Sequence, residues 1–371
     1  MSDMHGLIYA YHASPSLGGF TESRTSASLP FCARYRLIDF ALSAMTNAGI
    51  RNVGVVMQHD YQSLLDHLGS GKDWELSRLS GGLRLLPPFG IRGSHIGEYR
   101  GCMDALSAVQ TYIDRILEDF VVLFRGDLAV NLDLHAVLDA HLRTGCEITA
   151  VCTENPRRGT SGACFVPDEA GVSREMLFSD SVPKGAVQSI EVYVITKALL
   201  VRLIDWSRAN GRGHFHRDAL AHYLRTGGAV GVYRHRGYTP SICTAADYFN
   251  ANMAMLRRES RGDLFSDARP VYTKGRSSVS TYYGENASSQ NSLVADGCYI
   301  EGELVNCILF RGVRVEKGAK LHNCVVMQDS VIGENAALSY VISDKYTVFS
   351  KGLVLSGNSR LPITVPKCKI I

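Results

Sequence analysis

The chain has 371 residues, a length that suggests two domains, and 46% of them are hydrophobic, which is enough for a sizeable core. The formal net charge is only +3, and no stretch reaches the ~18 apolar residues of a membrane span. These values argue against a nucleic-acid-binding protein, a membrane protein and a largely disordered chain. The N-terminus shows no signal-peptide pattern and the ten cysteines contain no CxxC pair, so we expect a cytoplasmic protein with free cysteines.

In chain order, short apolar runs alternate with stretches of helical period before residue 258. The runs expected to form buried strands are residues 6–10, 52–57, 119–124, 147–152 and 189–195. The stretches expected to form helices are residues 38–48, 105–117 and 244–258. This alternation predicts an α/β domain over residues 1–258. Residues 259–290 are rich in Ser, Arg, Gly, Asp and Tyr and have little periodicity, so we expect a surface linker there.

A six-residue period begins after residue 291. One apolar track consists of Val313, Ala319, Val325, Val331 and Ala337, and a second of Leu309, Val315, Leu321 and Met327. Neither a helix nor a hairpin strand keeps a period of six on one face, whereas a parallel β-helix does, with one short strand per side. We therefore predict a hexapeptide-repeat β-helix of roughly three to five coils over residues 291–371.

Five further segments carry sequence patterns that are weak singly and specific together. They are Leu29–Phe40 (LPFCARYRLIDF), Gly69–Leu76 (GSGKDWEL), Gly101–Ala105 (GCMDA), Gly126–Asp127 and Ala251–Met253 (ANM). These segments resemble bacterial glucose-1-phosphate adenylyltransferase (ADP-glucose pyrophosphorylase). The resemblance implies an α/β domain with a nucleotidyltransferase-type (Rossmann-like) mixed sheet, followed by a short left-handed parallel β-helix. It also implies the family's reaction, in which ATP and glucose 1-phosphate give ADP-glucose and pyrophosphate.

The phosphate-binding loop of the family is replaced in this chain. After its first strand the family has A-G-G-x-G-x-R-L. Here Tyr11 and His12 stand at the first two glycines, Ser14 at the third and Ser16 at the arginine. Side chains at the glycine positions would keep phosphates away from the backbone. We therefore do not expect an intact triphosphate cradle.

Other positions that the chemistry needs are also altered. Ser26 stands where the family has a lysine, and Ser241 where it has the second metal carboxylate. By the resemblance, Asp127 is a vestigial metal ligand, and Gly101 and Asp104 are weak, vestigial substrate-binding positions. Losing one transition-state donor costs ~10²–10³ in rate, and losing a phosphate-neutralising arginine ~10³–10⁵. No catalytic residue is expected to be intact.

A well-kept scaffold around a degenerate site favours a non-catalytic subunit over an active enzyme. The chain resembles the regulatory, D-type partner found beside the catalytic subunit in some glycogen-making bacteria. This hypothesis implies little or no activity alone, no cofactor required by this chain, and Mg²⁺ at the site of the catalytic partner. By analogy the assembly is a heterotetramer, and the chain can also form homo-oligomers.

Two alternatives remain open at this point. The first is an active nucleotidyltransferase with rearranged ligands, in which Asp127 and either Asp104 or Asp133 hold Mg²⁺. The second is an acyltransferase that uses His322 of the β-helix, although its short repeat and single histidine argue against it.

Overall fold

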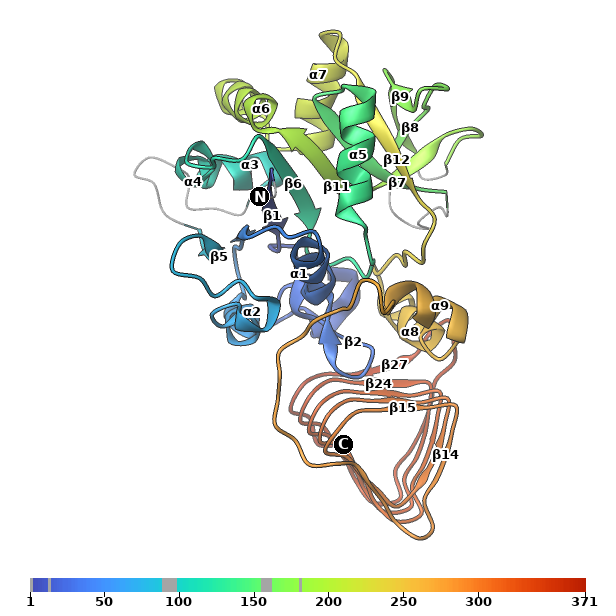
Figure 1. Cartoon of the computed structure of the whole chain (residues 1–371). Coiled ribbons are helices and arrows are strands. Elements are labelled where there is room, and N and C mark those ends of the chain that lie inside the picture. Colours follow the sequence, from blue (N-terminus) through green and yellow to red (C-terminus); the bar gives the residue numbers. More distant parts are fainter. Residues whose placement is uncertain (1–2, 13–14, 89–98, 155–161, 180–181) are drawn as a thin grey trace.

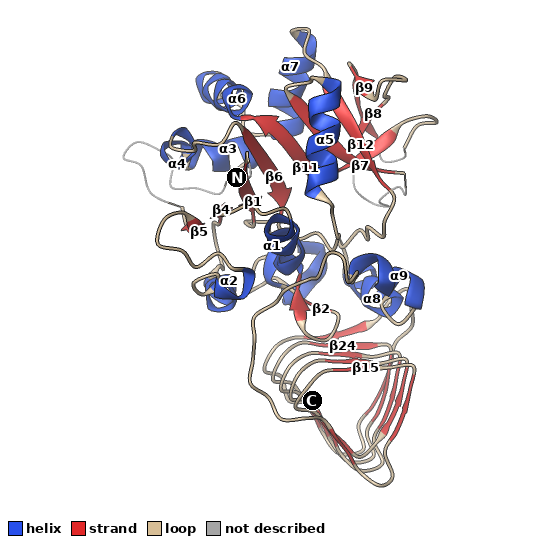
Figure 2. Cartoon of the chain, viewed as in Figure 1, coloured by secondary structure: helices blue, strands red, loops and turns tan. Residues whose placement is uncertain are grey.

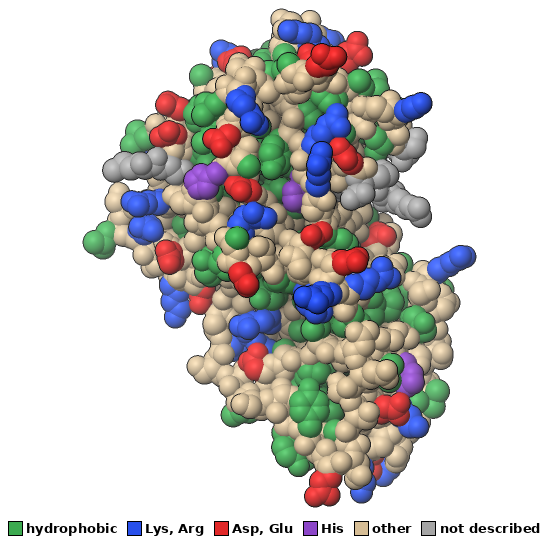
Figure 3. Space-filling model, turned by 45° about the vertical axis from the view of Figure 1, so that its right-hand side comes forward, with side chains coloured by type: hydrophobic (Ala, Val, Ile, Leu, Met, Phe, Trp, Pro, Cys, Tyr) green, Lys and Arg blue, Asp and Glu red, His purple; other side chains and the backbone are tan. Residues whose placement is uncertain are grey.

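The computed structural model describes residues 3–12, 15–88, 99–154, 162–179 and 182–371. An α/β domain forms the upper part of the view in Figure 1, and a triangular β-helix forms the lower part. Figure 2 shows strands along each side of the triangle, joined by short turns. Within the described ranges no helix is long and apolar enough to cross a membrane. Lys and Arg side chains are interspersed with Asp and Glu over the face shown in Figure 3.

A ten-stranded mixed sheet forms the centre of the α/β domain. Its strands are β1 (Met4–Tyr9), β4 (Asn52–Val56), β5 (Gly82–Leu86), β6 (Phe120–Arg125), β7 (Ile148–Thr153), β8 (Gly162–Phe165), β9 (Val172–Ser173), β10 (Met176–Ser179), β11 (Val187–Thr196) and β12 (Val230–His235). The main path is β5-β4-β1-β6-β11-β7-β12-β9, and β8 and β10 extend from β11. Strands β5, β4, β1 and β6 are parallel, whereas β11 runs antiparallel to β6 and β7. The five strands expected from the sequence are β1, β4, β6, β7 and β11, so the mixed α/β sheet is confirmed.

Helices cover both faces of this sheet. They are α1 (Leu37–Asn47), α2 (Gln62–Leu68), α3 (Cys102–Ala108), α4 (Gln110–Asp114), α5 (Leu134–Thr144), α6 (Lys197–Ala209), a π-helical turn (Phe215–Leu220), α7 (Ala221–Arg225), α8 (Ala245–Ala254) and α9 (Arg258–Leu264). Helices α1, α2 and α5 pack on one face, and α3, α4 and α6 on the other. Short 3-10 segments occur at Pro15–Phe20, Ser26–Ser28 and Lys72–Trp74.

Two expected helices are divided. The helix expected at 105–117 is interrupted at Val109, whose φ of −110° and ψ of 17° are not helical, so α3 and α4 are separate. The helix expected at 244–258 ends at Ala254. It begins at a capping box in which Thr244 and Asp247 each accept a backbone N–H from the other residue. Helix α9 follows inside the segment that was expected to be linker.

The C-terminal region is a left-handed β-helix of three five-stranded parallel sheets. The first contains β13 (Tyr282–Tyr283), β16 (Tyr299–Ile300), β19 (Arg314–Val315), β22 (Val331–Ile332) and β25 (Val348–Phe349). The second contains β14 (Ser288–Gln290), β17 (Glu303–Val305), β20 (Lys320–His322), β23 (Ala337–Ser339) and β26 (Val354–Ser356). The third contains β15 (Leu293–Val294), β18 (Ile308–Leu309), β21 (Val325–Val326), β24 (Val341–Ser343) and β27 (Ile363–Val365). The first strand of the β-helix begins at Tyr282, earlier than the predicted start at residue 291. The sequence did not indicate this earlier start, because the first coil is polar and carries little of the apolar repeat.

The period of six holds on only two of the three sides. Val305 pairs with His322 and His322 with Ser339, so these coils contain 17 residues and one side is a residue short. The short corners are turned by Asn306, Asn323 and Tyr340, whose φ values are 52°, 53° and 53°. Left-handed corners of this kind suit asparagine in particular.

The short side corrects the predicted inward track. Val313 and Ala319 point into the β-helix as expected, but Val325 and Met327 lie on its outer face, and the track continues through Ile332 instead of Val331. Val325 and Met327 are nevertheless buried, because this face packs against the α/β domain.

The interface between the two domains is largely apolar. Strand β2 (Pro30–Phe31), which pairs with β3 (Tyr35–Arg36), lies with α8 and α9 over the third sheet of the β-helix. Among the described residues, an ion pair between Arg24 and Asp344 crosses this interface, and the two side chains are 3% and 0% exposed. A buried pair of this kind strongly opposes separation of its two charges.

Candidate functional site

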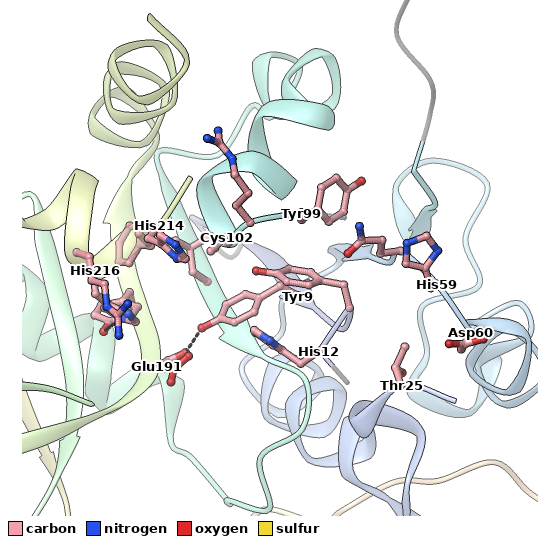
Figure 4. Close-up of a pocket in the computed structure, with 18 of the residues that line it drawn as sticks. Tyr9, His12, Thr25, His59, Asp60, Tyr99, Cys102, Glu191, His214 and His216 are labelled. Carbon is pink, nitrogen blue, oxygen red and sulfur yellow. Dashed lines mark hydrogen bonds between the residues drawn. The ribbon is translucent and has the colours of Figure 1, made fainter. Parts of the chain in front are cut away.

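A cleft of about 610 Å³ opens at the carboxyl ends of β1 and β4, where ligand sites of open α/β sheets occur. Figure 4 shows Tyr9, His12 and Glu191 on one side of it, and Thr25, His59 and Asp60 on another. Tyr9 ends β1, and its hydroxyl donates a hydrogen bond to the backbone carbonyl of Glu191 (2.7 Å). The cleft therefore lies where the sequence predicts the phosphate-binding loop.

Aromatic rings fill the positions of the missing glycines. The ring centroids of Tyr11 and His12 are 4.5 Å apart, and Tyr99 meets Tyr11 edge to face at 5.5 Å. Burial, and then the nearby Arg125, lower the pKa of His12, so its ring is neutral at pH 7. Side chains therefore line this wall where the family has glycines, and the neutral His12 ring adds no positive charge for a triphosphate. Ser14, the third replaced glycine, lies outside the described residues.

Asp127, to which the resemblance assigns a vestigial metal-binding role, is paired with an arginine of the same chain. Arg125 Nε donates to Asp127 Oδ1 (2.5 Å) and Nη2 to Oδ2 (3.0 Å), while Nη1 donates to Glu191 Oε1 (2.8 Å). Burial alone would raise the pKa of Asp127, but the guanidinium outweighs it and holds that pKa below its usual value. Both carboxylates in turn raise the pKa of Arg125, against the effect of burial. A guanidinium thus supplies the positive charge that Mg²⁺ would supply in an active site.

The expected substrate-binding positions lie beside the cleft. Gly101 lines it, and a Cβ at that position would stand 2.6 Å from the carbonyl oxygen of Gly213. Asp104 is held by Arg100, whose Nε and Nη2 donate to its two oxygens at 2.7 and 3.0 Å. This carboxylate, like that of Asp127, therefore forms an ion pair with an arginine. Asp133 caps α5 by accepting the N–H of Ala136 and does not line the cleft.

The three degenerate serines do not line the cleft. Ser16 is exposed in the 3-10 segment that begins at Pro15. Ser26 is 2% exposed, its N–H donates to the carbonyl of His12 (2.8 Å), and its hydroxyl has no hydrogen-bond partner among the residues that the structure describes. Ser241 lies 3.4 Å from the Cys243 sulfur. Among the residues described, no three His, Cys, Asp or Glu side chains are grouped so as to hold a metal ion.

Arg125 and Glu191 are site residues that were not predicted from the sequence. One signal for Arg125 was present: residues two apart at a strand end point to the same side, which places Arg125 beside Asp127. Glu191 carried no such signal, because it reaches the site from a neighbouring strand. His322, the histidine of the acyltransferase alternative, is 44% exposed on β20 and lies 3.6 Å from Glu303. It does not line the cleft described above.

A second cleft, of about 410 Å³, lies between the two domains. We call it the cationic cleft, because many basic side chains and a single acidic one, Asp66, line it. The basic residues are Arg34, Arg36, Lys274, Arg276, Arg311, Lys345 and Lys367. Burial and the adjacent Arg36 and Arg24 lower the pKa of Lys345 from 10.5 to about 7. The concentration of positive charge makes this cleft a candidate anion site.

Comparisons with known proteins agree with this architecture. The nucleotidyl transferase family model matches residues 16–162, and a model of the GlmU-like C-terminal hexapeptide region matches residues 277–360. The glycogen biosynthesis protein GlgD of Bacillus subtilis (strain 168) is 32% identical over 370 residues, covering 99% of this chain and 96% of that protein.

Glucose-1-phosphate adenylyltransferases are also similar. That of Bacillus thuringiensis (strain Al Hakam) is 28% identical over 91% of both chains. That of Acetivibrio thermocellus is 29% identical over 96% of this chain and 84% of that protein. The chain therefore belongs to the bacterial glucose-1-phosphate adenylyltransferase family, in which it resembles the D-type glycogen biosynthesis protein.

Proposed function

We propose that this chain is a regulatory subunit of glucose-1-phosphate adenylyltransferase in glycogen biosynthesis. It has little or no activity alone and modulates a catalytic partner that makes ADP-glucose and pyrophosphate from ATP and glucose 1-phosphate. The observation that carries the proposal is the pairing of Asp127 with Arg125. The similarity to a glycogen biosynthesis protein, which extends over almost the whole length of both chains, also supports the proposal.

Adenylyl transfer requires that the phosphates be positioned and their charge neutralised. Tyr11 and His12 line this cleft at the positions of the phosphate cradle. Behind Glu191, which also lines the cleft, Arg125 pairs with Asp127, the carboxylate that would hold Mg²⁺. Binding of Mg²⁺ there would bring two like charges together. The site is therefore unsuited to Mg²⁺–ATP, and in this proposal Mg²⁺ acts only at the site of the catalytic partner.

The partner is a catalytic chain of the same family, in a cytoplasmic hetero-oligomer that is a tetramer by analogy. A subunit without chemistry of its own can still raise its neighbour's activity, if its interface binds the competent conformation of that neighbour more tightly. The cationic cleft supports a regulatory role, because an anion bound there would bridge the α/β domain and the β-helix. Such an anion would be an allosteric effector of the assembly.

The test is an assay of ADP-glucose formation by the purified chain alone, by a catalytic homologue from the same organism, and by their mixture. The proposal predicts no turnover above background for the chain alone and a changed kcat or substrate KM for the mixture. Equal amounts of serum albumin in place of the chain control for nonspecific protein effects. Robust Mg²⁺-dependent turnover by the chain alone would favour the active enzyme with rearranged ligands.

A further inference from the structure

Polar atoms without hydrogen-bond partners gather at the cleft beside β1. The hydroxyls of Tyr11, Thr25 and Tyr99, Nε2 of His12 and Nη1 of Arg24 are withdrawn from solvent and have no partner in the described part of the chain. An unsatisfied buried polar group costs about 1–3 kcal/mol, so native proteins contain few of them. Five at one cleft indicate that a polar ligand completes this wall.

These atoms share one space because the segments that carry them are joined. The N–H of Ser26 donates to the carbonyl of His12, which places Thr25 beside the aromatic pair of Tyr11 and His12. Tyr99 closes the group through its edge contact with Tyr11. All five residues that carry the unpartnered atoms line the 610 Å³ cleft. A volume of this size suits a small-molecule ligand.

The charge of the cleft disfavours a strongly anionic ligand. Arg24 is paired with Asp344, and Arg100 with Asp104. Of the other charged residues that line the cleft, Glu191 is paired with Arg125, and Arg217 and Asp60 are exposed and of opposite sign. The cleft therefore offers no excess of positive charge to a phosphate, in contrast to the cationic cleft between the domains.

We propose that this cleft binds a neutral, hydroxyl-rich sugar of one or two hexose rings. Hydroxyl groups both donate and accept hydrogen bonds, so sugar hydroxyls can satisfy the tyrosine and threonine hydroxyls and the neutral His12 ring together. The ring faces of Tyr11 and Tyr99, and the 43% exposed Phe178 that also lines the cleft, supply apolar surface for the carbon face of a sugar. A sugar therefore matches both the unpartnered atoms and the lack of net charge.

Calorimetric titration of the full chain with glucose and maltose tests the proposal. Saturable binding of at least one of these sugars at one site per chain is expected, with no gain in affinity for glucose 1-phosphate or for Mg²⁺–ADP. Absence of binding by both neutral sugars would overturn the proposal. Tenfold tighter binding of either phosphorylated compound that Tyr11→Phe weakens would also overturn it, because this cleft, and not the cationic cleft, would then be the phosphate site.

Matched substitutions test whether the sugar binds in this cleft. Thr25→Val and Tyr11→Phe each remove one hydroxyl without changing the shape of the side chain greatly, and each should weaken binding about 3- to 10-fold. Because these hydroxyls have no partner in the described part of the chain, neither variant should lower the midpoint of urea unfolding. Thr273→Val is the control: its hydroxyl is equally unpartnered but lies away from the cleft, so the sugar affinity should not change. Wild-type affinity in both cleft variants would overturn the assignment of the site, and would leave the proposed subunit function unaffected, since that rests on the mixing assay.

Discussion

Glu191 reaches Arg125 at 2.8 Å from a backbone conformation with a φ of 64°, which residues other than glycine rarely adopt. It lies where the pairing of β11 with β7 shifts register between Ser189 and Val192. A left-handed residue of this kind costs roughly 1–3 kcal/mol and persists only where its surroundings hold it. Its ion pair with Arg125 provides such a restraint, and the irregular strand directs its carboxylate toward the cleft.

The backbone strain at Glu191 can be measured by comparing two substitutions. Glu191→Ala and Glu191→Gly both remove the carboxylate, but only glycine is at ease at a φ of 64°. Glu191→Gly should therefore be more stable than Glu191→Ala by about 1 kcal/mol in urea unfolding, the reverse of the usual order within a strand. A more stable alanine variant would show that the strand relaxes to an ordinary conformation.

Arg125 is expected to be essential to stability at neutral pH. Arg125→Met keeps most of the volume of the side chain but leaves Asp127 and Glu191 without a counter-charge, so the free energy of unfolding should fall by about 3–5 kcal/mol. The combination of Arg125→Met with Asp127→Asn and Glu191→Gln should recover most of that loss, because no charge remains unpaired. Urea unfolding at pH 7 measures both, and a loss below about 1 kcal/mol in the single variant would argue against a tightly coupled ion pair.

Restoring the degenerate serines is not expected to restore ATP binding. Ser16→Arg, Ser26→Lys and Ser241→Asp together would return charges that the family has, but Asp127 would still be bound by Arg125. Tyr11 and His12 would also still fill the glycine positions. A fluorescent ATP analogue should therefore bind the triple variant no better than the wild type, and a tenfold gain would show that the remaining scaffold is a competent site.

Lys345 should make stability depend on pH above neutrality. Its pKa falls from 10.5 to about 7 on folding, so between these values the unfolded chain binds more protons than the folded one. The contribution of Lys345 to stability is therefore smallest below pH 7 and rises by up to about 1.4 kcal/mol per pH unit between pH 7 and 10.5. Lys345→Met should lose this increment, which is measured as the difference between variant and wild type in urea unfolding at pH 7, 8 and 9. Parallel pH profiles for the two proteins would contradict the lowered pKa.

The sequence was sufficient where a repeating apolar pattern decides the structure. Five buried strands and the coiled C-terminal region follow from such patterns. The break at Val109 was not predictable, because the apolar positions continue across it with helical spacing. The inward register beyond Cys324 was also missed, because Val325 and Met327 keep the six-residue spacing and are buried against the other domain instead.

The site was only partly predictable for a different reason. The losses at Tyr11 and His12 could be seen by comparison with the family's loop. The gain of Arg125 could not be interpreted in the same way, since a charged residue at a strand end is ordinary until its partners are known. Its partner Glu191 is 66 residues away in the sequence, and only the fold joins them.

Mn²⁺ binding to the purified chain tests whether Arg125 holds the place of a divalent cation at Asp127. Electron paramagnetic resonance in the presence of ATP counts bound Mn²⁺, with a catalytic homologue as the positive control. Because Arg125 already neutralises Asp127, no stoichiometric Mn²⁺ is expected on this chain, whether or not Asp127 is changed to asparagine. One Mn²⁺ per chain that Mg²⁺ displaces and that Asp127→Asn abolishes would contradict this expectation.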